Sequence, residues 1–202
     1  MIEVYISAIP KRESTIPLSC VERQNEIERI SNERVRREKY YVWRLLEYAI
    51  KNSLGADASR LCFTKGKNGK WYCEGFEFSI SHSGDALAVA LSDKPVGIDV
   101  ERIRVRNAER MSGYCLTQNE LEAYLSVCED SRDEWLIRMW CAKEAIFKFQ
   151  DKDSYIPAKI EVADFFSDIS SFELDGEKYI LAVATETEDK IRSFGVSVCD
   201  IQ

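Results

Sequence analysis

Two carboxylates stand two residues apart at the end of an apolar stretch. Asp99 and Glu101 follow Gly97, and the residues of segment 96–100 are typical of a β-strand. Because residues i and i+2 of a strand point to the same face, we expect the two carboxylates side by side. Neighbouring carboxylates repel unless a cation lies between them, and Mg²⁺ commonly takes carboxylates, water and phosphate oxygens as ligands. The pattern favours a magnesium site, with a water-exposed acidic strand end as the alternative.

A second candidate lies in segment 140–148, Trp-Cys-Ala-Lys-Glu-Ala-Ile-Phe-Lys. Glu144 and Lys148 are four residues apart and share one face of the expected helix. An exposed pair of this kind contributes only about 0.3–0.5 kcal/mol and is common on helix surfaces. This helix is strongly apolar, however, and a Glu–Lys pair on a buried helix needs a partner or a chemical task. Both interpretations stay open on these residues alone.

The chain has a single histidine, His82, and three serines surround it in segment 79–83. Hydroxyls, an imidazole and turn amides suit an oxyanion such as phosphate. Lys70, in the basic glycine-containing loop 65–70, could add a point charge. The nucleophile elbow Gly-x-Ser-x-Gly and the nucleotide P-loop are both absent from these segments. A serine-rich turn with an incidental histidine is the alternative.

Four segments in this order resemble the 4′-phosphopantetheinyl transferase superfamily, in particular its Sfp-like subclass built from two halves. They are Gly69-Lys70, Ser79 to Ser83, Gly97 to Glu101 and Trp140 to Lys148. The resemblance implies that 4′-phosphopantetheine passes from coenzyme A to a serine of an acyl or peptidyl carrier protein, which releases 3′,5′-ADP. It implies an enzyme, a holo-[acyl-carrier-protein] synthase that depends on Mg²⁺.

The resemblance also implies roles for single residues. Asp99, Glu101 and Glu144 would hold Mg²⁺, Glu144 would align or deprotonate the attacking serine, and Lys148 would stabilise the departing phosphate. Coenzyme A would be bound by basic, hydroxyl and imidazole groups: Lys70, Ser81, His82, Lys143, Lys148, Arg34 and Arg37. Three positions depart from the family pattern, since Trp71 replaces the proline after Gly69-Lys70, Ser79 replaces an asparagine, and Cys141 replaces a serine or threonine.

Periodicity predicts the elements that must position these residues. Alternation of apolar residues predicts a strand at 2–9, and further strands are expected at 76–80, 86–91, 96–100, near 160, 179–184 and 194–199. A long helix is expected over about 32–52, ending before Gly55. Capping-box patterns at Ser19–Glu22, Thr117–Glu120 and Ser131–Glu134 predict three further helix starts, and the last of these helices runs to about Phe149.

The two halves of the chain echo one another. Trp, Glu and Lys recur at four-residue steps in both long helices, as Trp43, Glu47, Lys51 and again as Trp140, Glu144, Lys148. The pattern suggests an α+β protein of two similar halves that form a pseudo-dimer, which is also the fold that the resemblance implies. We expect an N-terminal half at 1–102 that binds the 3′-phosphate of coenzyme A, a C-terminal half at 103–202 with the Lys-Glu-x-x-x-Lys helix, and the active site between them.

Composition excludes several classes of protein. The 202 residues are 45% apolar and 31% charged, which is ordinary for a globular chain. The longest apolar runs are too short to cross a membrane, and Glu3 argues against a signal peptide, so we expect a cytoplasmic protein. Seven cysteines without a Cys-x-x-Cys pair, beside one histidine, make a structural zinc site improbable and suggest reduced thiols.

Charge further limits the partners. The net charge of −7 resides in residues 151–202, which argues against a general nucleic-acid binder. The arginine-rich segment Glu101 to Arg110 suits an acidic carrier protein, and we expect it to dock there on a monomer. Two other functions stay open: a degenerate homologue that binds coenzyme A or a carrier without transfer, and an unrelated Mg²⁺-dependent phosphohydrolase.

Overall fold

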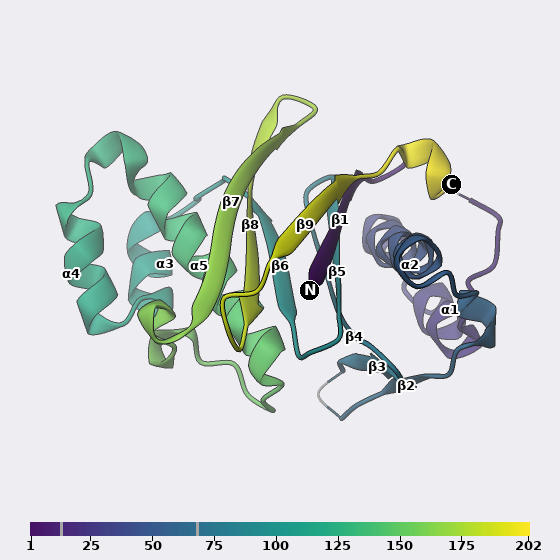
Figure 1. The fold of residues 1–202 in the computed structure, drawn as a ribbon. Helices are drawn as coiled ribbons and strands as arrows, with labels where there is room; N and C mark the ends of the chain where they lie inside the picture. The colour runs from purple at the N-terminus through teal and green to yellow at the C-terminus, as the bar shows by residue number, and fades with distance from the viewer. Residues whose placement is uncertain (13, 68) are drawn as a thin grey trace.

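Two β-sheets lie between two groups of helices in the computed structural model, which describes residues 1–12, 14–67 and 69–202 (Figure 1). The four-stranded sheet has the order β4 (Glu77–Ser83), β5 (Ala86–Ser92), β1 (Ile2–Ala8) and β9 (Ile191–Gly195). The three-stranded sheet has the order β6 (Gly97–Arg102), β8 (Glu177–Thr185) and β7 (Phe166–Leu174). Strands β2 (Phe63–Lys65) and β3 (Trp71–Cys73) form a separate hairpin. The α+β class expected from the sequence is confirmed.

The helices are α1 (Val21–Glu28), α2 (Glu33–Leu54), α3 (Ala108–Cys115), α4 (Gln118–Ser126) and α5 (Arg132–Gln150). Helix α2 packs on β4, β5 and β1, whereas α5 packs on β6 and β8. Five short 3₁₀ helices complete these elements, at Ala58–Arg60, Glu129–Ser131, Pro157–Lys159, Val162–Asp164 and Val198–Asp200. Each half is therefore a long helix on a mainly antiparallel sheet, which agrees with the repeat seen in the sequence.

Alternating side-chain size along β5 explains how the two sheets come together. Leu87, Val89 and Leu91 point toward α2 and belong to the core of the first half. The small residues Ala86, Ala88 and Ala90 point the other way, against Ile98 and Val100 of β6 and against β8. Because alanine projects only a methyl group, the backbones of the two sheets approach closely, and both faces of β5 are buried.

The strand assignment differs from the expected boundary between the halves. β9, from the C-terminal half, pairs in parallel with β1. β6, placed in the N-terminal half by the boundary at residue 102, pairs with β8 in the second sheet. The chain therefore crosses between the halves twice, once before β6 and once before β9. Hydrophobic alternation identifies a strand but does not say which sheet it joins.

Local predictions met different outcomes. Helix α2 begins after Asn32, whose Oδ1 accepts a hydrogen bond from the Val35 N–H, and ends at Gly55 with φ 62°. The capping box at Thr117 is confirmed. At Ser19 it is wrong, because α1 has Cys20 as its N-cap residue and no capping hydrogen bond from its side chain.

Other boundaries shifted. At Ser131 a helix does begin, but the serine side chain makes no capping hydrogen bond. The strand expected near residue 160 is replaced by the 3₁₀ helices at Pro157–Lys159 and Val162–Asp164, with β7 following later in the chain. The last strand covers 191–195 and not 194–199. No helix within the described residues has the length and apolar character needed to cross a membrane.

Candidate active site

Three serines of β4 connect the two sheets. Ser79, Ser81 and Ser83 alternate along the strand and point toward β6. Their hydroxyl oxygens accept hydrogen bonds from alternate backbone N–H groups of β6, those of Ile98 at 3.0 Å, Val100 at 3.3 Å and Arg102 at 3.3 Å. These side-chain bonds take the place of a backbone ladder between β4 and β6. They set the register of the strand that carries Asp99 and Glu101.

Two of these serines also hold the carboxylates. The Ser81 hydroxyl donates a hydrogen bond to Oδ1 of Asp99 at 2.7 Å, and Ser83 donates to Oε2 of Glu101 at 2.7 Å. The hydroxyl of Ser81 is therefore used twice within the junction of the two sheets. This corrects the expectation that the Ser81 side chain contacts coenzyme A, because it is buried and positions Asp99 instead.

Asp99 is the most buried of the three expected metal ligands. Its Oδ1 accepts hydrogen bonds from Ser81 and from the ammonium of Lys148, at 2.7 Å in each case. Its Oδ2 is buried and has no hydrogen-bond partner among the described residues. A carboxylate oxygen without a donor is costly in a buried site, so it is suited to receive a cation.

Glu101 lies beside Asp99 on β6, as the strand spacing predicted. Besides Ser83, its Oε1 accepts a hydrogen bond of 3.3 Å from the indole Nε1 of Trp140 on α5. Burial, and then the charge of Asp99, raise the pKa of Glu101 to about 7. A carboxylate whose pKa is raised in part by a neighbouring like charge lies where little positive charge is available.

Lys148 reaches this pair from helix α5, and Glu144 lies one turn before it on the same helix. Burial, followed by the charge of Asp99, raises the pKa of Glu144 above its ordinary value. Lys148 donates to Oδ1 of Asp99 and, at 3.0 Å, to the backbone carbonyl of Ile98. Burial lowers the pKa of Lys148, but Asp99 and Glu144 outweigh it, so the pKa lies above the ordinary value. The ammonium stays charged and is the counterion of the carboxylates.

The three carboxylates do not form a closed ligand cluster. Among the described residues, no group of three or more His, Cys, Asp or Glu side chains has the spacing of a metal site. The expected triad is therefore not assembled, and Lys148 rather than a third carboxylate contacts Asp99. The donor set is nevertheless one of hard oxygens, and the unpartnered Oδ2 of Asp99 provides a ligand atom. The chemistry of these residues fits Mg²⁺, but the carboxylate of Glu144 would have to move closer to Asp99 and Glu101 to bind the same ion.

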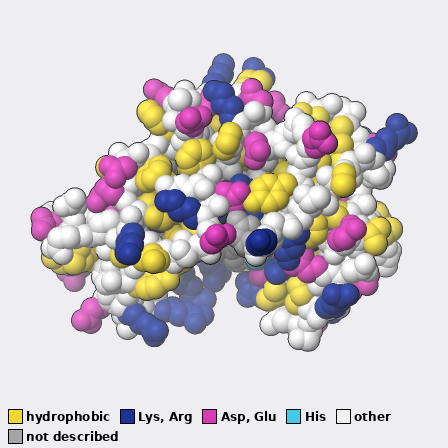
Figure 2. Space-filling view, turned by 90° about the horizontal axis from the view of Figure 1, so that it is seen from below, with side chains coloured by type: hydrophobic (Ala, Val, Ile, Leu, Met, Phe, Trp, Pro, Cys, Tyr) yellow, Lys and Arg dark blue, Asp and Glu magenta, His cyan; other side chains and the backbone are white. Residues whose placement is uncertain are grey.

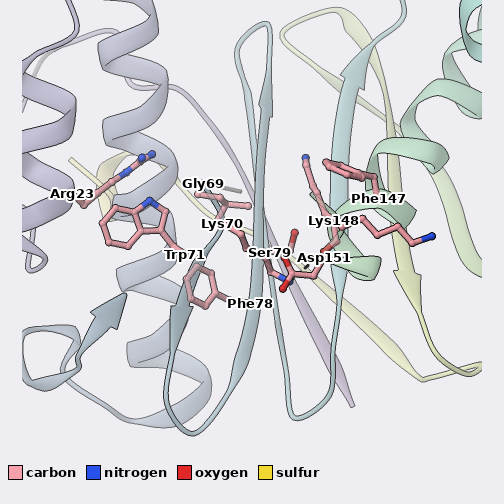
Figure 3. A pocket seen from close by; sticks show the side chains of 11 residues that line it. Arg23, Gly69, Lys70, Trp71, Phe78, Ser79, Phe147, Lys148 and Asp151 are labelled. Atoms are coloured by element: carbon pink, nitrogen blue, oxygen red, sulfur yellow. Dashed lines mark hydrogen bonds and ion pairs between the residues drawn. The ribbon is translucent and has the colours of Figure 1, made fainter. Parts of the chain in front are cut away.

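A cavity of about 250 Å³ opens next to Lys148, and both halves line it (Figure 3). Gly69, Lys70, Trp71 and Ser79 come from the first half, whereas Phe147, Lys148 and Asp151 come from α5 and its C-terminal end. Seen from below, the molecule is hollowed between its halves, and Lys and Arg side chains stand along the rim (Figure 2). A hollow with basic walls beside carboxylates suits a phosphorylated ligand.

Lys70 lines this cavity, and its expected contact with coenzyme A stays a prediction. Its ammonium donates a hydrogen bond to the backbone carbonyl of Lys148 at 3.2 Å and lies 3.9 Å from Oδ2 of Asp151. The Tyr72 hydroxyl donates to the same carboxylate oxygen at 2.6 Å. The hairpin β2–β3 is thereby linked to the end of α5, across the two halves. Residue 68 of the expected basic loop lies outside the described residues.

His82 points away from the carboxylates, toward α2. Its Nδ1 lies 3.7 Å from Oε2 of Glu38, and Arg34 donates to the other oxygen of Glu38 at 2.9 Å. Burial lowers the pKa of His82, while Glu38 opposes that shift. The structure therefore brings Arg34 and His82 together around one carboxylate. Neither lines the cavity beside Lys148.

Arg37 and Lys143 lie elsewhere. Arg37 lines a different cavity, of about 470 Å³, between α1, α2 and residues 14–17. Lys143 is fully buried, forms an ion pair of 2.5 Å with Glu120, and donates to the carbonyls of Pro157 and Ile160. The expectation that Lys143 contacts coenzyme A is wrong, because its ammonium faces α4 and the segment after α5.

Sequence reasoning missed several residues of this region. Ser83 was part of the serine-rich segment, and its two-residue spacing from Ser81 could have paired it with Glu101. Trp140 opens the segment that resembles the family helix, but the sequence assigned it no role, although its indole contacts Glu101. Tyr72 and Asp151 carry no motif, and their meeting across 79 positions depends on the fold.

Comparison with known proteins shows the family of this chain. Residues 95–199 match the family model described as the 4′-phosphopantetheinyl transferase superfamily. A 4′-phosphopantetheinyl transferase of Bacillus pumilus is 30% identical over 114 residues, 54% of this chain and 47% of its own length. One from Aneurinibacillus migulanus is 33% identical over 101 residues, 48% and 41% of the two chains. One from Escherichia coli K12 is 32% identical over 112 residues, 54% and 57% of the two chains. The chain spans about half the length of these curated relatives.

Proposed function

Because this chain belongs to the 4′-phosphopantetheinyl transferase superfamily, we propose that it transfers 4′-phosphopantetheine from coenzyme A to a serine of an acyl or peptidyl carrier protein. One observation carries the proposal. Asp99, with its unpartnered Oδ2, meets the ammonium of Lys148 beside a basic-walled cavity that both halves line. Anionic oxygens and a fixed cation at one point suit the transfer of a phosphoryl group, which needs charge neutralisation more than covalent help.

Asp99, Glu101 and Glu144 would hold Mg²⁺. When bound, the ion supplies positive charge to the pyrophosphate of coenzyme A. The three carboxylates support this assignment, because the charge of Asp99 raises the pKa of both Glu101 and Glu144, although burial contributes more in each case. A cation would relieve that repulsion. Ser81, Ser83 and Trp140 would keep Asp99 and Glu101 in place as they bind it.

Glu144 and Lys148 would serve the transfer itself. The serine oxygen of the carrier forms a bond to the phosphorus next to pantetheine, and the bond from that phosphorus to the 3′,5′-ADP oxygen breaks. Glu144 would orient the serine or accept its proton. Lys148, whose pKa lies above its ordinary value, would neutralise charge on the departing ADP.

Coenzyme A would enter between the halves. Lys70 and Lys148 line the cavity and would contact its phosphates, and Arg34 and His82 would contribute from the neighbouring end of α2 and β4. Lys143 and Arg37 are not part of this assignment. Because both halves of one chain line the cavity, we also propose that the protein acts as a monomer. We further propose that it works in the cytoplasm and acts on proteins, not on nucleic acid.

Intact-mass spectrometry tests the proposal. Apo carrier proteins of fatty-acid, polyketide and peptide synthesis are incubated with this protein, coenzyme A and Mg²⁺, and parallel samples contain EDTA. We expect a phosphopantetheine mass gain on at least one carrier, and none with EDTA. A gain that survives EDTA would overturn the role of the metal. Release of ADP from coenzyme A without any carrier would favour a phosphohydrolase.

Asp99→Asn is the matching variant. The amide keeps the shape of the side chain and an oxygen that can accept from Ser81, but it removes the charge that Mg²⁺ and Lys148 need. We expect transfer to fall at least about 100-fold, as for the loss of one preorganised electrostatic contact. Asp168→Asn, an exposed change on β7, is the control and should keep full activity. Full activity of Asp99→Asn would refute the assignment.

A further inference from the structure

The hydroxyl of Tyr155 is buried without a hydrogen bond among the described residues. The residue lies between the end of α5 and the 3₁₀ helix at Pro157–Lys159. A buried hydroxyl with no partner costs a folded protein about 1–3 kcal/mol relative to one that is bonded. Stability therefore does not explain why a tyrosine rather than a phenylalanine stands here, and a hydroxyl of this kind points to a function.

The ring of Tyr155 is held by its neighbours on α5. Its centroid lies 4.8 Å from that of Phe147 and 5.8 Å from that of Trp140, in a tilted and an edge-on arrangement respectively. These two residues flank Glu144 at positions i−4 and i+3, so all three share one face of the helix. The direction of the Tyr155 side chain is thus set by aromatic packing, with its hydroxyl left unbonded.

The backbone near Tyr155 is anchored as well. The buried ammonium of Lys143 donates hydrogen bonds to the carbonyls of Pro157 at 3.0 Å and Ile160 at 2.5 Å. Pro157 and Ile160 are themselves buried. The segment that follows Tyr155 is therefore attached to α5 at Lys143, the residue directly before Glu144.

Because Tyr155 packs on Trp140 and Phe147, which flank Glu144 on one face of α5, its ring lies beside Glu144. Burial, followed by the charge of Glu144, raises the pKa of Tyr155, and the Tyr155 hydroxyl in turn acts to lower the pKa of Glu144. The other two carboxylates each receive a side-chain hydrogen bond, from Ser81 and from Ser83 with Trp140. Within the described part of the chain, no hydrogen bond of ordinary length reaches Glu144. Tyr155 is the donor placed to supply the missing one.

We propose that Tyr155 is a positioning residue, whose hydroxyl donates a hydrogen bond to the carboxylate of Glu144 when that carboxylate turns toward Asp99 and Glu101. The donor would hold one Glu144 oxygen and leave the other for the metal, as Ser81 and Lys148 hold Oδ1 of Asp99 and leave its Oδ2 without a partner. This inference rests on the proposed function, because it assigns Glu144 to the Mg²⁺ site. It deepens that assignment by naming the group that completes the support of the third carboxylate.

Tyr155→Phe tests the inference, because it removes one oxygen and keeps the ring. Mg²⁺ alone is titrated into the protein by calorimetry, and the tryptophan fluorescence is followed in parallel, since Trp140 contacts Glu101. We expect the dissociation constant for Mg²⁺ to rise at least fivefold. The unfolding midpoint should be unchanged or higher, since a hydroxyl without a partner is lost. Tyr114→Phe is the matched control, because Tyr114 packs on the same Trp140 with an exposed side chain, and it should bind Mg²⁺ as the wild type does.

A double-mutant cycle separates a positioning role from a structural one. In a Glu144→Gln background, Tyr155→Phe should no longer weaken Mg²⁺ binding, because the carboxylate that it supports is gone. Equal Mg²⁺ affinity of wild type and Tyr155→Phe would overturn the inference, and so would a loss of stability that accounts for the weaker binding. The titration does not depend on the transfer reaction. If the wild type binds Mg²⁺ but modifies no carrier, the proposed function fails, and the Mg²⁺ affinity of Tyr155→Phe still decides this inference.

Discussion

Two lysines on α5 show how position on a helix decides the role of a residue. Lys143 and Lys148 are five residues apart, so their side chains leave the helix about 140° from one another, at 100° per residue. Lys148 reaches Asp99 and lines the cavity, whereas Lys143 is buried against Glu120 of α4. The same ammonium group thus neutralises a site carboxylate in one place and ties the second half together in the other. Lys148, four residues after Glu144, shares its face of the helix. Lys143 is adjacent to Glu144 in sequence but points in another direction.

Lys143→Met is expected to destabilise the protein and leave coenzyme A binding unchanged. The change keeps the length of the side chain but leaves the buried carboxylate of Glu120 without its cation, which costs about 3–5 kcal/mol in unfolding free energy. Urea denaturation measures this loss. The double variant Lys143→Met with Glu120→Leu should recover a large part of it. A raised KM for coenzyme A at unchanged stability would instead return Lys143 to the binding site.

At the scale of elements, the approach of α5 to β6 builds the site. A Cβ atom on Gly97 would lie 1.9 Å from the carbonyl oxygen of Ala145 and 2.5 Å from the backbone nitrogen of Phe149. Only glycine fits, and the helix backbone therefore rests directly on the start of the strand. That contact lets Lys148 reach the carbonyl of Ile98 and the carboxylate of Asp99. The glycine before the carboxylates is thus required by packing.

Gly97→Ala is expected to lower the unfolding free energy by at least about 3 kcal/mol, because neither backbone can yield without shifting the helix. Gly113→Ala is the control, since Gly113 lies in α3 with open space around it and should gain about 0.5–1 kcal/mol from the better helix former. Thermal unfolding of both variants checks this pair. Equal melting temperatures would mean that α5 is not held against β6 as described.

At the scale of the whole molecule, charge is distributed unevenly. The chain carries a net charge of −7, yet Arg104 and Arg106 are exposed in the segment between β6 and α3, and Arg110 is exposed in the first turn of α3. That segment begins where β6 ends, close in sequence to Glu101. An acidic carrier protein would be attracted to these arginines and repelled by the acidic remainder of the surface, which favours one docking orientation.

The double variant Arg104→Glu with Arg106→Glu is expected to raise the KM for the carrier about tenfold at low salt. The KM for coenzyme A should not change, and the difference should shrink at high ionic strength, because exposed charges are screened. Arg60→Glu with Arg192→Glu alters the net charge equally on other exposed parts of the chain. Steady-state transfer assays compare the two pairs. An equal effect of both would indicate net charge alone and no docking at this segment.

The sequence by itself determined the local part of this description. Short apolar segments identified most strands, the helix expected over about 32–52 and ending before Gly55 matched α2, and strand geometry placed Asp99 beside Glu101. These predictions succeeded because they depend on residues close in the chain, where backbone geometry alone sets the spacing. The repeat of helix and strand likewise predicted two similar α+β halves.

Only the tertiary structure decided what joins across the halves. The exchange of β6 and β9 between sheets, the serine contacts from β4 to β6 and the link from Tyr72 to Asp151 all connect residues far apart in sequence. It also decided that Ser81 and Lys143 face inward and that Tyr155 packs on the α5 face that carries Glu144. Their side-chain partners come from other elements, and burial depends on how whole sheets and helices pack. Residue type and spacing therefore indicate which chemistry is available, whereas packing decides which groups meet to perform it.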